Sequence, residues 1–425
     1  MRYVIHGGTP LTGTLFVQGA KNAILPMIAA ALMPAQGQTI LRNVPPLNDV
    51  MVSLELAASL GANVNYFATE QVLLIDPGPM QRHTLDGEVT AKSRASVLFL
   101  APVLRRFGVV EASAFGGCAI GPRRLDFHYN GFKRLGGRVE SDPDGSMRIR
   151  AERLTGNLVY LDLPSQTSTE NLMMAATVAA GRTIIENAAM EPEVIDFGNM
   201  LNQMGARISG VGTATIIIDG VPALRPVEYT VMHDRLDAGS FMMAAAATGG
   251  DVALVGACLE HMRILQVKLE QMGADIQANG MVVRVIGPKR PRPVNAVTWA
   301  YPGLSTDFLP GLTALATIAD GTSYLRENIF DDRFTQIEGL TALGAQIERR
   351  NAGFAVIQGV AQLTGTDLRA PDLRAGMSYV TAALAAQGQT TIDNVYQIQR
   401  GYAHLVERLR GLGADIAIFD DADTP

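Results

Sequence analysis

Cysteine is scarce in this sequence. Only two of its 425 residues are cysteines, Cys118 and Cys258. Two thiols cannot build a disulfide framework, and no Cys/His cluster has the spacing of a metal site. We therefore expect free thiols in a reducing compartment, with Cys258, which lies in an apolar run, as a small core residue.

Long apolar runs are also missing. The first eight residues lack the apolar core of a signal peptide. The runs at 24–33 and 241–247 are far shorter than the roughly 20 residues that span a membrane. A net charge of −6 gives no signature of nucleic-acid binding. We expect a soluble, cytoplasmic protein that neither inserts into a membrane nor binds nucleic acid; the oligomeric state is not indicated.

The composition predicts a folded chain. Hydrophobic residues make up 48% and charged residues 18% of the sequence, which argues against disorder. A length of 425 residues is typical of two or three domains. If the ligand is anionic, its site must be a local basic cluster on an otherwise acidic protein.

A repeat is the most informative feature. An apolar residue, Gly, a small residue, any residue and then Val or Ile occur together six times, with the glycines at 61, 136, 205, 273, 344 and 413. Apolar residues at helical spacing precede most copies, which predicts a helix that ends at a Gly cap and is followed at once by a strand. The six units are about 70 residues long and account for nearly the whole chain.

A second element recurs in phase with the first. Each unit also contains an Ala-rich apolar helix, a Gly turn and a β-rich stretch, as at 37–40 and 181–184. A β/α solenoid is one interpretation of such repeats. The helices at 172–180 and 241–247 are hydrophobic nearly all round, however, which favours helices inside and sheets outside.

Several apolar helices begin with small, polar or basic residues, at 19–22, 92–96, 165–169 and 374–376. Helix N-termini attract anions, and ordinary capping by Ser, Thr or Asp is the simpler explanation of any single one. Capping does not require Lys21, Arg94 or Arg374, whose charges oppose the helix dipole by a few tenths to about 1 kcal/mol each. A bound anion would remove that conflict.

The stretch 114–128 combines three glycines, Cys118 and, a few residues on, Arg123 and Arg124. Glycine and proline predict a loop, where burial in a regular core is not expected. Nearby cations favour the reactive thiolate form of a cysteine.

With these motifs, the chain resembles the UDP-N-acetylglucosamine 1-carboxyvinyltransferases of the enolpyruvyl transferase superfamily, from about residue 13 to 416. The segments that carry the resemblance are 19–23, 94–96, 116–121, 185–189, 191–193, 234–235, 305–307, 330–334, 372–375 and 400–402. The resemblance implies an α/β (α+β) fold of two inside-out α/β barrels, with six βαβ-type repeats, three per domain. One domain would span 21–230, and the other would combine 1–20 with 231–425.

The resemblance also implies the reaction. The enolpyruvyl group of phosphoenolpyruvate would move to the 3-hydroxyl of UDP-N-acetylglucosamine with release of phosphate, as in the first committed step of peptidoglycan synthesis. Cations would stabilise the charges, so that no metal or other cofactor is expected. Family members are alkylated at the matching cysteine by fosfomycin, which implies the same for Cys118.

The residue roles follow from the matched motifs. Asp307 would accept the hydroxyl proton, and Cys118 would act as acid or transient nucleophile and aid product release. Lys21, the third expected catalytic residue, would hold the phosphate of phosphoenolpyruvate together with Arg123, and Arg94 would support that side. Arg333, Arg374 and Arg400 would hold the carboxylate. The other expected substrate-binding residues are Asn22, Asp126, Phe127, Ser165, Gln166, Thr167 and Ile329. The simpler explanation of Asp307 alone is a helix cap, which Thr306 could provide equally well.

Departures from the family pattern gather on the nucleotide side. Ser165–Thr169 reads Ser-Gln-Thr-Ser-Thr where Ser-Val-Gly-Ala-Thr is common, and Arg124 and Leu98 replace Pro and Trp. Asp332 stands where Asn is usual. Two alternatives therefore stay open: a paralogue that enolpyruvylates another nucleotide, and a non-catalytic protein that binds a sugar nucleotide as a regulator.

Overall fold

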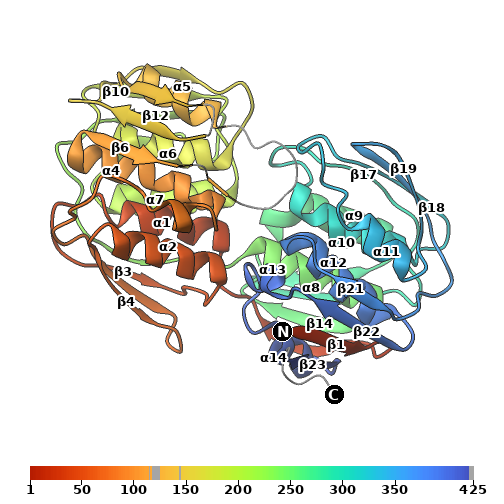
Figure 1. Ribbon diagram of the computed structural model, residues 1–425. Helices are drawn as coiled ribbons and strands as arrows, with labels where there is room; N and C mark the ends of the chain where they lie inside the picture. The colour runs from red at the N-terminus through yellow and green to blue at the C-terminus, as the bar shows by residue number, and fades with distance from the viewer. Residues whose placement is uncertain (114, 117–124, 143–144, 421–425) are drawn as a thin grey trace. The chain divides into compact units, whose positions relative to one another are not determined.

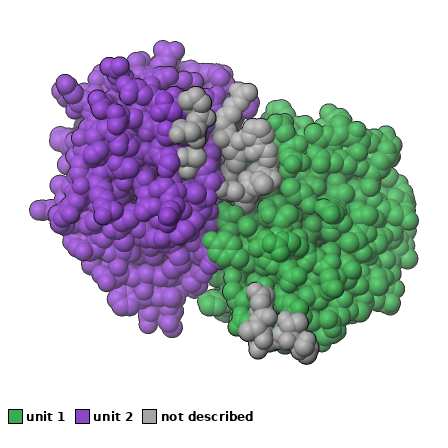
Figure 2. Space-filling view, in the orientation of Figure 1, with its two compact units in different colours: residues 1–18, 118–123, 233–425 green, residues 19–117, 124–232 purple. Residues whose placement is uncertain are grey.

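The computed structural model describes residues 1–113, 115–116, 125–142 and 145–420 (Figure 1). These residues form two compact units (Figure 2). Unit 1 comprises 1–18 and 233–420, and unit 2 comprises the described part of 19–232. In the described part of the chain, no helix is both long and apolar enough to cross a lipid bilayer.

Unit 1 contains three four-stranded sheets. Their strand orders are β21 (Asp367–Arg369), β22 (Gln389–Asp393), β1 (Arg2–His6), β23 (Asp415–Phe419); β15 (Asp275–Asn279), β16 (Val282–Ile286), β14 (Asp251–Val255), β2 (Thr12–Phe16); and β17 (Asn295–Val297), β18 (Thr322–Arg326), β20 (Phe354–Gln358), β19 (Gln346–Asn351). Along most of these strands buried side chains alternate with more exposed ones, as expected when only one face of a sheet meets the core.

Unit 2 repeats this plan. Its sheets have the orders β13 (Glu228–Thr230), β3 (Thr39–Arg42), β5 (Val72–Asp76), β4 (Asn63–Phe67); β11 (Arg207–Ser209), β12 (Thr215–Asp219), β10 (Arg182–Glu186), β9 (Leu158–Tyr160); and β6 (Val109–Ala112), β8 (Met147–Arg150), β7 (Arg138–Ser141). The last sheet has three strands, and a parallel bridge between Thr84 and Glu111 takes the place of the fourth.

The predicted repeat is confirmed in all six sheets. Each sheet has one parallel pairing and otherwise antiparallel ones, and the strand after the Gly motif always lies at one edge. In the unit around β9 and β10, for example, helix α6 (Gln166–Thr177) joins the two parallel strands as a βαβ crossover. All six motif glycines have φ between +89° and +102°, a conformation that glycine adopts without a Cβ clash.

The apolar helices lie inside, as predicted, which excludes a solenoid. In unit 1, α8 (Arg235–Thr248), α10 (Leu309–Ala316) and α12 (Leu373–Ala385) pack on one another, and α8 is buried from Arg235 to Ala246. In unit 2 the inner helices are α1 (Lys21–Ala30), η1 (Arg94–Phe99) with α4 (Leu100–Phe107), and α6. Helices buried on every side need no polar face, which accounts for their continuous apolar sequences.

Amphipathic helices complete the units. The helices before the Gly motifs are α2 (Asn48–Ser59), α5 (Asp126–Arg134), α7 (Pro192–Gln203), α9 (Arg263–Gln271), α11 (Ile337–Ala342) and α14 (Leu405–Gly411). Shorter segments are α3 (Gly87–Thr90), η2 (Leu259–Met262), η3 (Thr306–Phe308) and α13 (Tyr396–Gln399). Cys258 precedes η2 and is half-buried rather than in the core, because its strand has ended before it.

Candidate active site

Asp307 lies in η3, directly before the inner helix α10 of unit 1. The cap of this turn is Ser305, whose Oγ accepts a hydrogen bond from the Asp307 N–H at 3.3 Å. Neither Asp307 nor Thr306 is therefore needed as the cap. The Asp307 carboxylate is 25% exposed and faces two arginines from distant parts of the chain.

Arg333 and Arg374 hold the two oxygens of Asp307. Arg333 Nη2 donates to Oδ1 at 2.9 Å, and Arg374 Nε donates to Oδ2 at 3.1 Å. The two arginine side chains are 2% and 5% exposed, respectively. Charge-assisted hydrogen bonds from these buried guanidinium groups fix the direction of the carboxylate.

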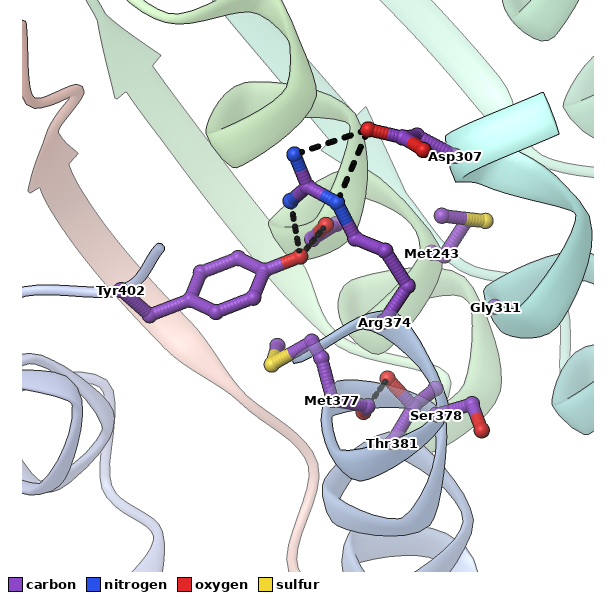
Figure 3. A pocket seen from close by; sticks show the side chains of 9 residues that line it. Met243, Asp307, Gly311, Arg374, Met377, Ser378, Thr381 and Tyr402 are labelled. Atoms are coloured by element: carbon purple, nitrogen blue, oxygen red, sulfur yellow. Dashed lines mark hydrogen bonds and ion pairs between the residues drawn. The ribbon is translucent and has the colours of Figure 1, made fainter. Parts of the chain in front are cut away.

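Tyr402 supports Arg374 from the other side (Figure 3). Arg374 Nη1 donates to Tyr402 Oη at 2.8 Å, and Ser240 Oγ of α8 lies 2.7 Å from the same oxygen. Burial raises the pKa of Tyr402, and the nearby Arg374 charge opposes that shift. Burial alone would lower the pKa of Arg374, but Tyr402 and Asp307 outweigh it and raise the pKa above its ordinary value. Arg374 is therefore a permanent cation in this site.

A pocket adjoins this group at the inner helices α8, α10 and α12 (Figure 3). Its lining residues are Ser240, Met243, Asp307, Gly311, Arg374, Met377, Ser378, Thr381 and Tyr402. Hydroxyl groups and two thioethers therefore line the same pocket as the ion pair of Asp307 and Arg374. Within the described residues, no group of three or more His, Cys, Asp or Glu side chains could hold a metal ion.

Asp372 caps the helix that carries Arg374. Its Oδ1 accepts from the backbone N–H groups of Arg374 at 2.9 Å and Ala375 at 3.2 Å, and lies 3.7 Å from Arg333 Nη1. Arg374 opposes the helix dipole, as the sequence indicated, and the carboxylate of Asp307 offsets its charge in the chain itself.

Arg400 and Ile329 lie on loops of the same unit. Arg400 directly follows α13, is 6% exposed and donates from Nη1 to Gln397 Oε1 at 3.1 Å. Ile329 is 41% exposed, and its backbone N–H donates to the buried Glu327 at 2.6 Å. The other carboxyl oxygen of Glu327 accepts from Thr306 Oγ1 at 2.8 Å, next to Asp307. Glu327 therefore joins the Ile329 loop to the Asp307 turn.

Lys21 begins the inner helix α1 of unit 2. No side chain caps this helix, and the buried Lys21 Nζ forms an ion pair with Asp49 Oδ2 of α2 at 2.6 Å. Asn22 follows in the first turn and is half-buried. The buried ammonium group at the start of this helix is paired with a carboxylate of a neighbouring helix, which offsets the cost of burying its charge.

Arg94 begins η1, where Ser93 Oγ accepts the capping bond from the Ala95 N–H. Arg94 is half-buried. Asp126 and Phe127 stand in the first turn of α5 and are also half-buried. The helix starts that the sequence predicts at Lys21 and Arg94 are confirmed.

His128, next to Phe127, is buried beside the Arg94 charge. Asn171 Nδ2, which also bonds Val97 O, lies 3.1 Å from His128 Nδ1 and donates to the neutral ring. Burial, and then the Arg94 charge, lower the pKa of His128 from 6.5 to about 3. The ring is therefore neutral in the folded chain at every pH where the chain would be used.

This histidine predicts an acid sensitivity. The unfolded chain takes up the proton at about pH 6.5 and the folded chain does not, so the contribution to stability is complete above pH 6.5 and is lost as pH falls towards 3. The expected loss is about 1.4 kcal/mol per pH unit. Urea unfolding at pH 7.5 and 5.5 measures it, with His128→Gln as the comparison. An identical pH dependence in both proteins would contradict the prediction.

The first turn of α6 carries Ser165, Gln166 and Thr167, all half-buried. Ser165 Oγ donates to Ser168 Oγ at 2.9 Å and caps no backbone N–H, whereas Gln166 Nε2 donates to Glu170 Oε1 at 3.1 Å. Burial raises the pKa of Glu170 well above its ordinary value, and the hydrogen bond from Gln166 opposes that shift. Glu170 thus fixes the side chain of Gln166 from a buried position.

The expected residues fall into two described groups. Unit 1 brings Asp307, Arg333 and Arg374 into direct contact, with Arg400 two residues from Tyr402. Unit 2 carries Lys21, Asn22, Arg94, Asp126, Phe127, Ser165, Gln166 and Thr167. Cys118 and Arg123 lie outside the described residues.

Sequence reasoning gave no role to several partners of these residues. They are Asp49, Glu170, Ser240, Glu327, Asp372 and Tyr402. Asp372 had a signal, since an Asp directly before a helix is a typical cap. The other contacts depend on tertiary structure and had none.

Comparison with known proteins defines the class of this fold and site. The family model of EPSP synthase (3-phosphoshikimate 1-carboxyvinyltransferase) matches residues 5–409, and the chain belongs to this family of enolpyruvyl transferases. The solved structure of the enolpyruvyl transferase NikO from Streptomyces tendae has a TM-score of 0.88 and 27% identity, with 98% of each chain covered. EPSP synthase from Acinetobacter baumannii, at 18% identity and a TM-score of 0.74, shares the fold.

Curated relatives resemble the chain more closely in sequence. The UDP-N-acetylglucosamine 1-carboxyvinyltransferase of Thermobifida fusca is 48% identical over 422 residues, which are 98% of each chain. The protein called UDP-N-acetylglucosamine 1-carboxyvinyltransferase 1 in Symbiobacterium thermophilum is 43% identical, over 98% of this chain and 95% of its own. The two-domain enolpyruvyl transferase fold expected from the sequence is confirmed.

Proposed function

We propose that this chain transfers the enolpyruvyl group of phosphoenolpyruvate to the 3-hydroxyl of UDP-N-acetylglucosamine and releases phosphate, the first committed step of peptidoglycan synthesis. The observation that carries the proposal is the Asp307 carboxylate, fixed between two buried arginines in a chain that is 48% identical to a transferase named for this acceptor. Units 1 and 2 would be its two domains, and we propose the cytoplasm as its location.

The reaction is an addition followed by an elimination. A proton adds to the methylene carbon of phosphoenolpyruvate while the sugar hydroxyl attacks the adjacent carbon; phosphate then leaves and the methylene carbon loses a proton. Asp307 accepts the hydroxyl proton, because its partly exposed carboxylate keeps lone pairs that the two arginines do not use. Cys118 serves as acid or transient nucleophile.

The carboxylate and the phosphate of phosphoenolpyruvate are assigned to different cations. In unit 1, Arg333, Arg374 and Arg400 bind its carboxylate through planar guanidinium groups, which suit bidentate recognition. Lys21 of unit 2 binds the phosphate together with Arg123, which lies outside the described residues, and Arg94 supports the phosphate end. The acceptor contacts Asn22, Asp126, Phe127, Ile329 and the first turn of α6. These cations would catalyse the reaction by stabilising the negative charges of the phosphate and the carboxylate.

The acceptor is tested by phosphate release from phosphoenolpyruvate with a panel of nucleotides. Release with UDP-N-acetylglucosamine is the expected result. Release only with UMP or another nucleotide would instead support the paralogue. Binding of UDP-N-acetylglucosamine without release from any acceptor would support a regulator.

Cys118→Ala is expected to abolish turnover while the protein stays folded. We expect a thiol in this Gly-rich stretch of sequence to contribute little packing, whereas the proposed acid or nucleophile is lost. Phosphate release and the melting temperature measure the two effects, and Cys258→Ala serves as the thiol control with activity retained. A large fall in melting temperature of the Cys118 variant would count against the prediction.

A further inference from the structure

The buried side chain of Gln18 holds the loop that carries Arg400 and Tyr402. Gln18 Nε2 donates to Gly401 O at 2.8 Å, and Gln18 Oε1 accepts from the Ala403 N–H at 2.9 Å. The side chain is 7% exposed. These two backbone groups lie on either side of Tyr402, so one amide fixes the backbone of Tyr402 at both ends.

The loop has little freedom elsewhere. A Cβ added at Gly401 would lie 2.7 Å from Leu373 Cδ1, so the backbone packs directly on the residue before Arg374. Tyr402 Oη in turn accepts from Arg374 Nη1. A shift of this loop would therefore move Arg400 and also change the support of Arg374.

Gln18 is itself fixed through its backbone. Its C=O accepts from the Asp234 N–H at 2.8 Å, and its N–H donates to Asp237 Oδ2 at 3.4 Å. Asp237 is buried and receives two bonds from Arg408, at 2.8 and 2.6 Å. Gln18 is also the last residue of the first segment of unit 1. Its side-chain amide therefore links the end of that segment to the loop that carries Arg400 and Tyr402.

We propose that Gln18 is a positioning residue for the end of the site that binds the carboxylate of phosphoenolpyruvate. The inference rests on the proposed function. Gln18 touches no substrate and acts through the backbone of Gly401 and Ala403 on Arg400 and Tyr402. Small errors in such placement weaken binding strongly, because the anion needs all its donors aligned at once.

Gln18→Met tests this with a side chain of similar length and no amide. We expect the KM for phosphoenolpyruvate to rise about tenfold or more, because the two hydrogen bonds of the Gln18 amide are lost. The KM for UDP-N-acetylglucosamine should change less than about twofold. A residue that only stabilises the fold would change both constants together or neither. Equal changes in the two constants would overturn the proposal.

Gln18→Glu adds a readout that packing alone would not move. A protonated glutamic acid can donate to Gly401 O and accept from Ala403 N–H, whereas the carboxylate cannot donate and repels the carbonyl. We expect the KM for phosphoenolpyruvate, relative to the unmodified chain, to recover as pH falls from 8 to 6. A ratio that does not change with pH would contradict the assigned bonds.

Gln336→Met is the matched control. Gln336 is a fully buried glutamine of the same unit, and its Nε2 donates to Thr313 Oγ1 in the core. Its loss should lower the melting temperature without separating the two KM values; the same separation as in Gln18→Met would overturn the proposal.

A second measurement is independent of turnover. Phosphoenolpyruvate should raise the melting temperature of the unmodified chain and raise that of Gln18→Met much less. If the unmodified chain releases no phosphate, the proposed function fails, and this comparison still decides the role of Gln18. Equal shifts in both proteins, or no shift in either, would overturn it.

Discussion

Asp307→Asn is expected to lower kcat for phosphate release by about 10²- to 10⁴-fold, the usual contribution of a general base. The amide keeps the shape of the side chain but cannot take the hydroxyl proton. It also removes the negative charge between Arg333 and Arg374, which are both nearly inaccessible to solvent. Rates at saturating concentrations of both substrates measure the effect.

Asp332→Asn is the control for this substitution. Asp332 lies one residue before Arg333, is 58% exposed and pairs only on the surface with Arg349 at 3.1 Å. Asparagine is also the usual family residue there, so kcat should hardly change. The Asp307 variant should melt at a lower temperature yet stay folded, because Asp372 still lies near Arg333. A kcat of the Asp307 variant close to that of the unmodified chain would remove this carboxylate from the mechanism.

Much of the fold could be predicted because it depends on local rules. The Gly motif specifies a left-handed cap six times, and every one of these glycines has a positive φ. A helix such as 241–247, with no polar face, is expected to be buried on all sides, and residues 241–246 are buried. These features need only neighbouring residues to be recognised.

The arrangement at the chain ends could not be derived in this way. Strand β1 pairs with β22 and β23, so residues 2–6 lie between two strands whose paired residues come more than 380 positions later. The last Gly motif predicts β23 but does not say which strand lies beside it. Such pairing is decided by the tertiary packing of the whole unit.

The site shows the same division. A basic residue at a helix start is visible in the sequence, whereas the carboxylates that meet it are not: Asp49 for Lys21, and Asp307 for Arg374. Residue roles came from the resemblance, which transfers motifs but not their contacts. The side-chain amide of Gln18 forms hydrogen bonds with residues 383 and 385 positions later in the chain. No pattern in the sequence indicates these hydrogen bonds.

Arg374→Ala is expected to weaken phosphoenolpyruvate binding by about two orders of magnitude and to affect the nucleotide far less. Hydrogen bonds to charged groups contribute about 1.5–3 kcal/mol each, and a guanidinium offers two to a carboxylate. Because Arg374 is buried and its pKa is raised, the charge lost was present at every working pH. The two KM values, measured by varying one substrate at saturating levels of the other, separate the effects.

Arg374→Lys and Arg350→Ala sharpen this prediction. Lysine keeps the charge, but a single ammonium cannot reach Asp307 and Tyr402 with the geometry that Arg374 uses at 3.1 and 2.8 Å, so an intermediate rise in KM is expected. Arg350 is 54% exposed and bonds Glu348 on an outer strand, so its loss should change neither constant. If Arg374→Ala raised both KM values equally, Arg374 would act on the fold of unit 1 rather than on the carboxylate. The anion site would then have to depend on Arg333 and Arg400.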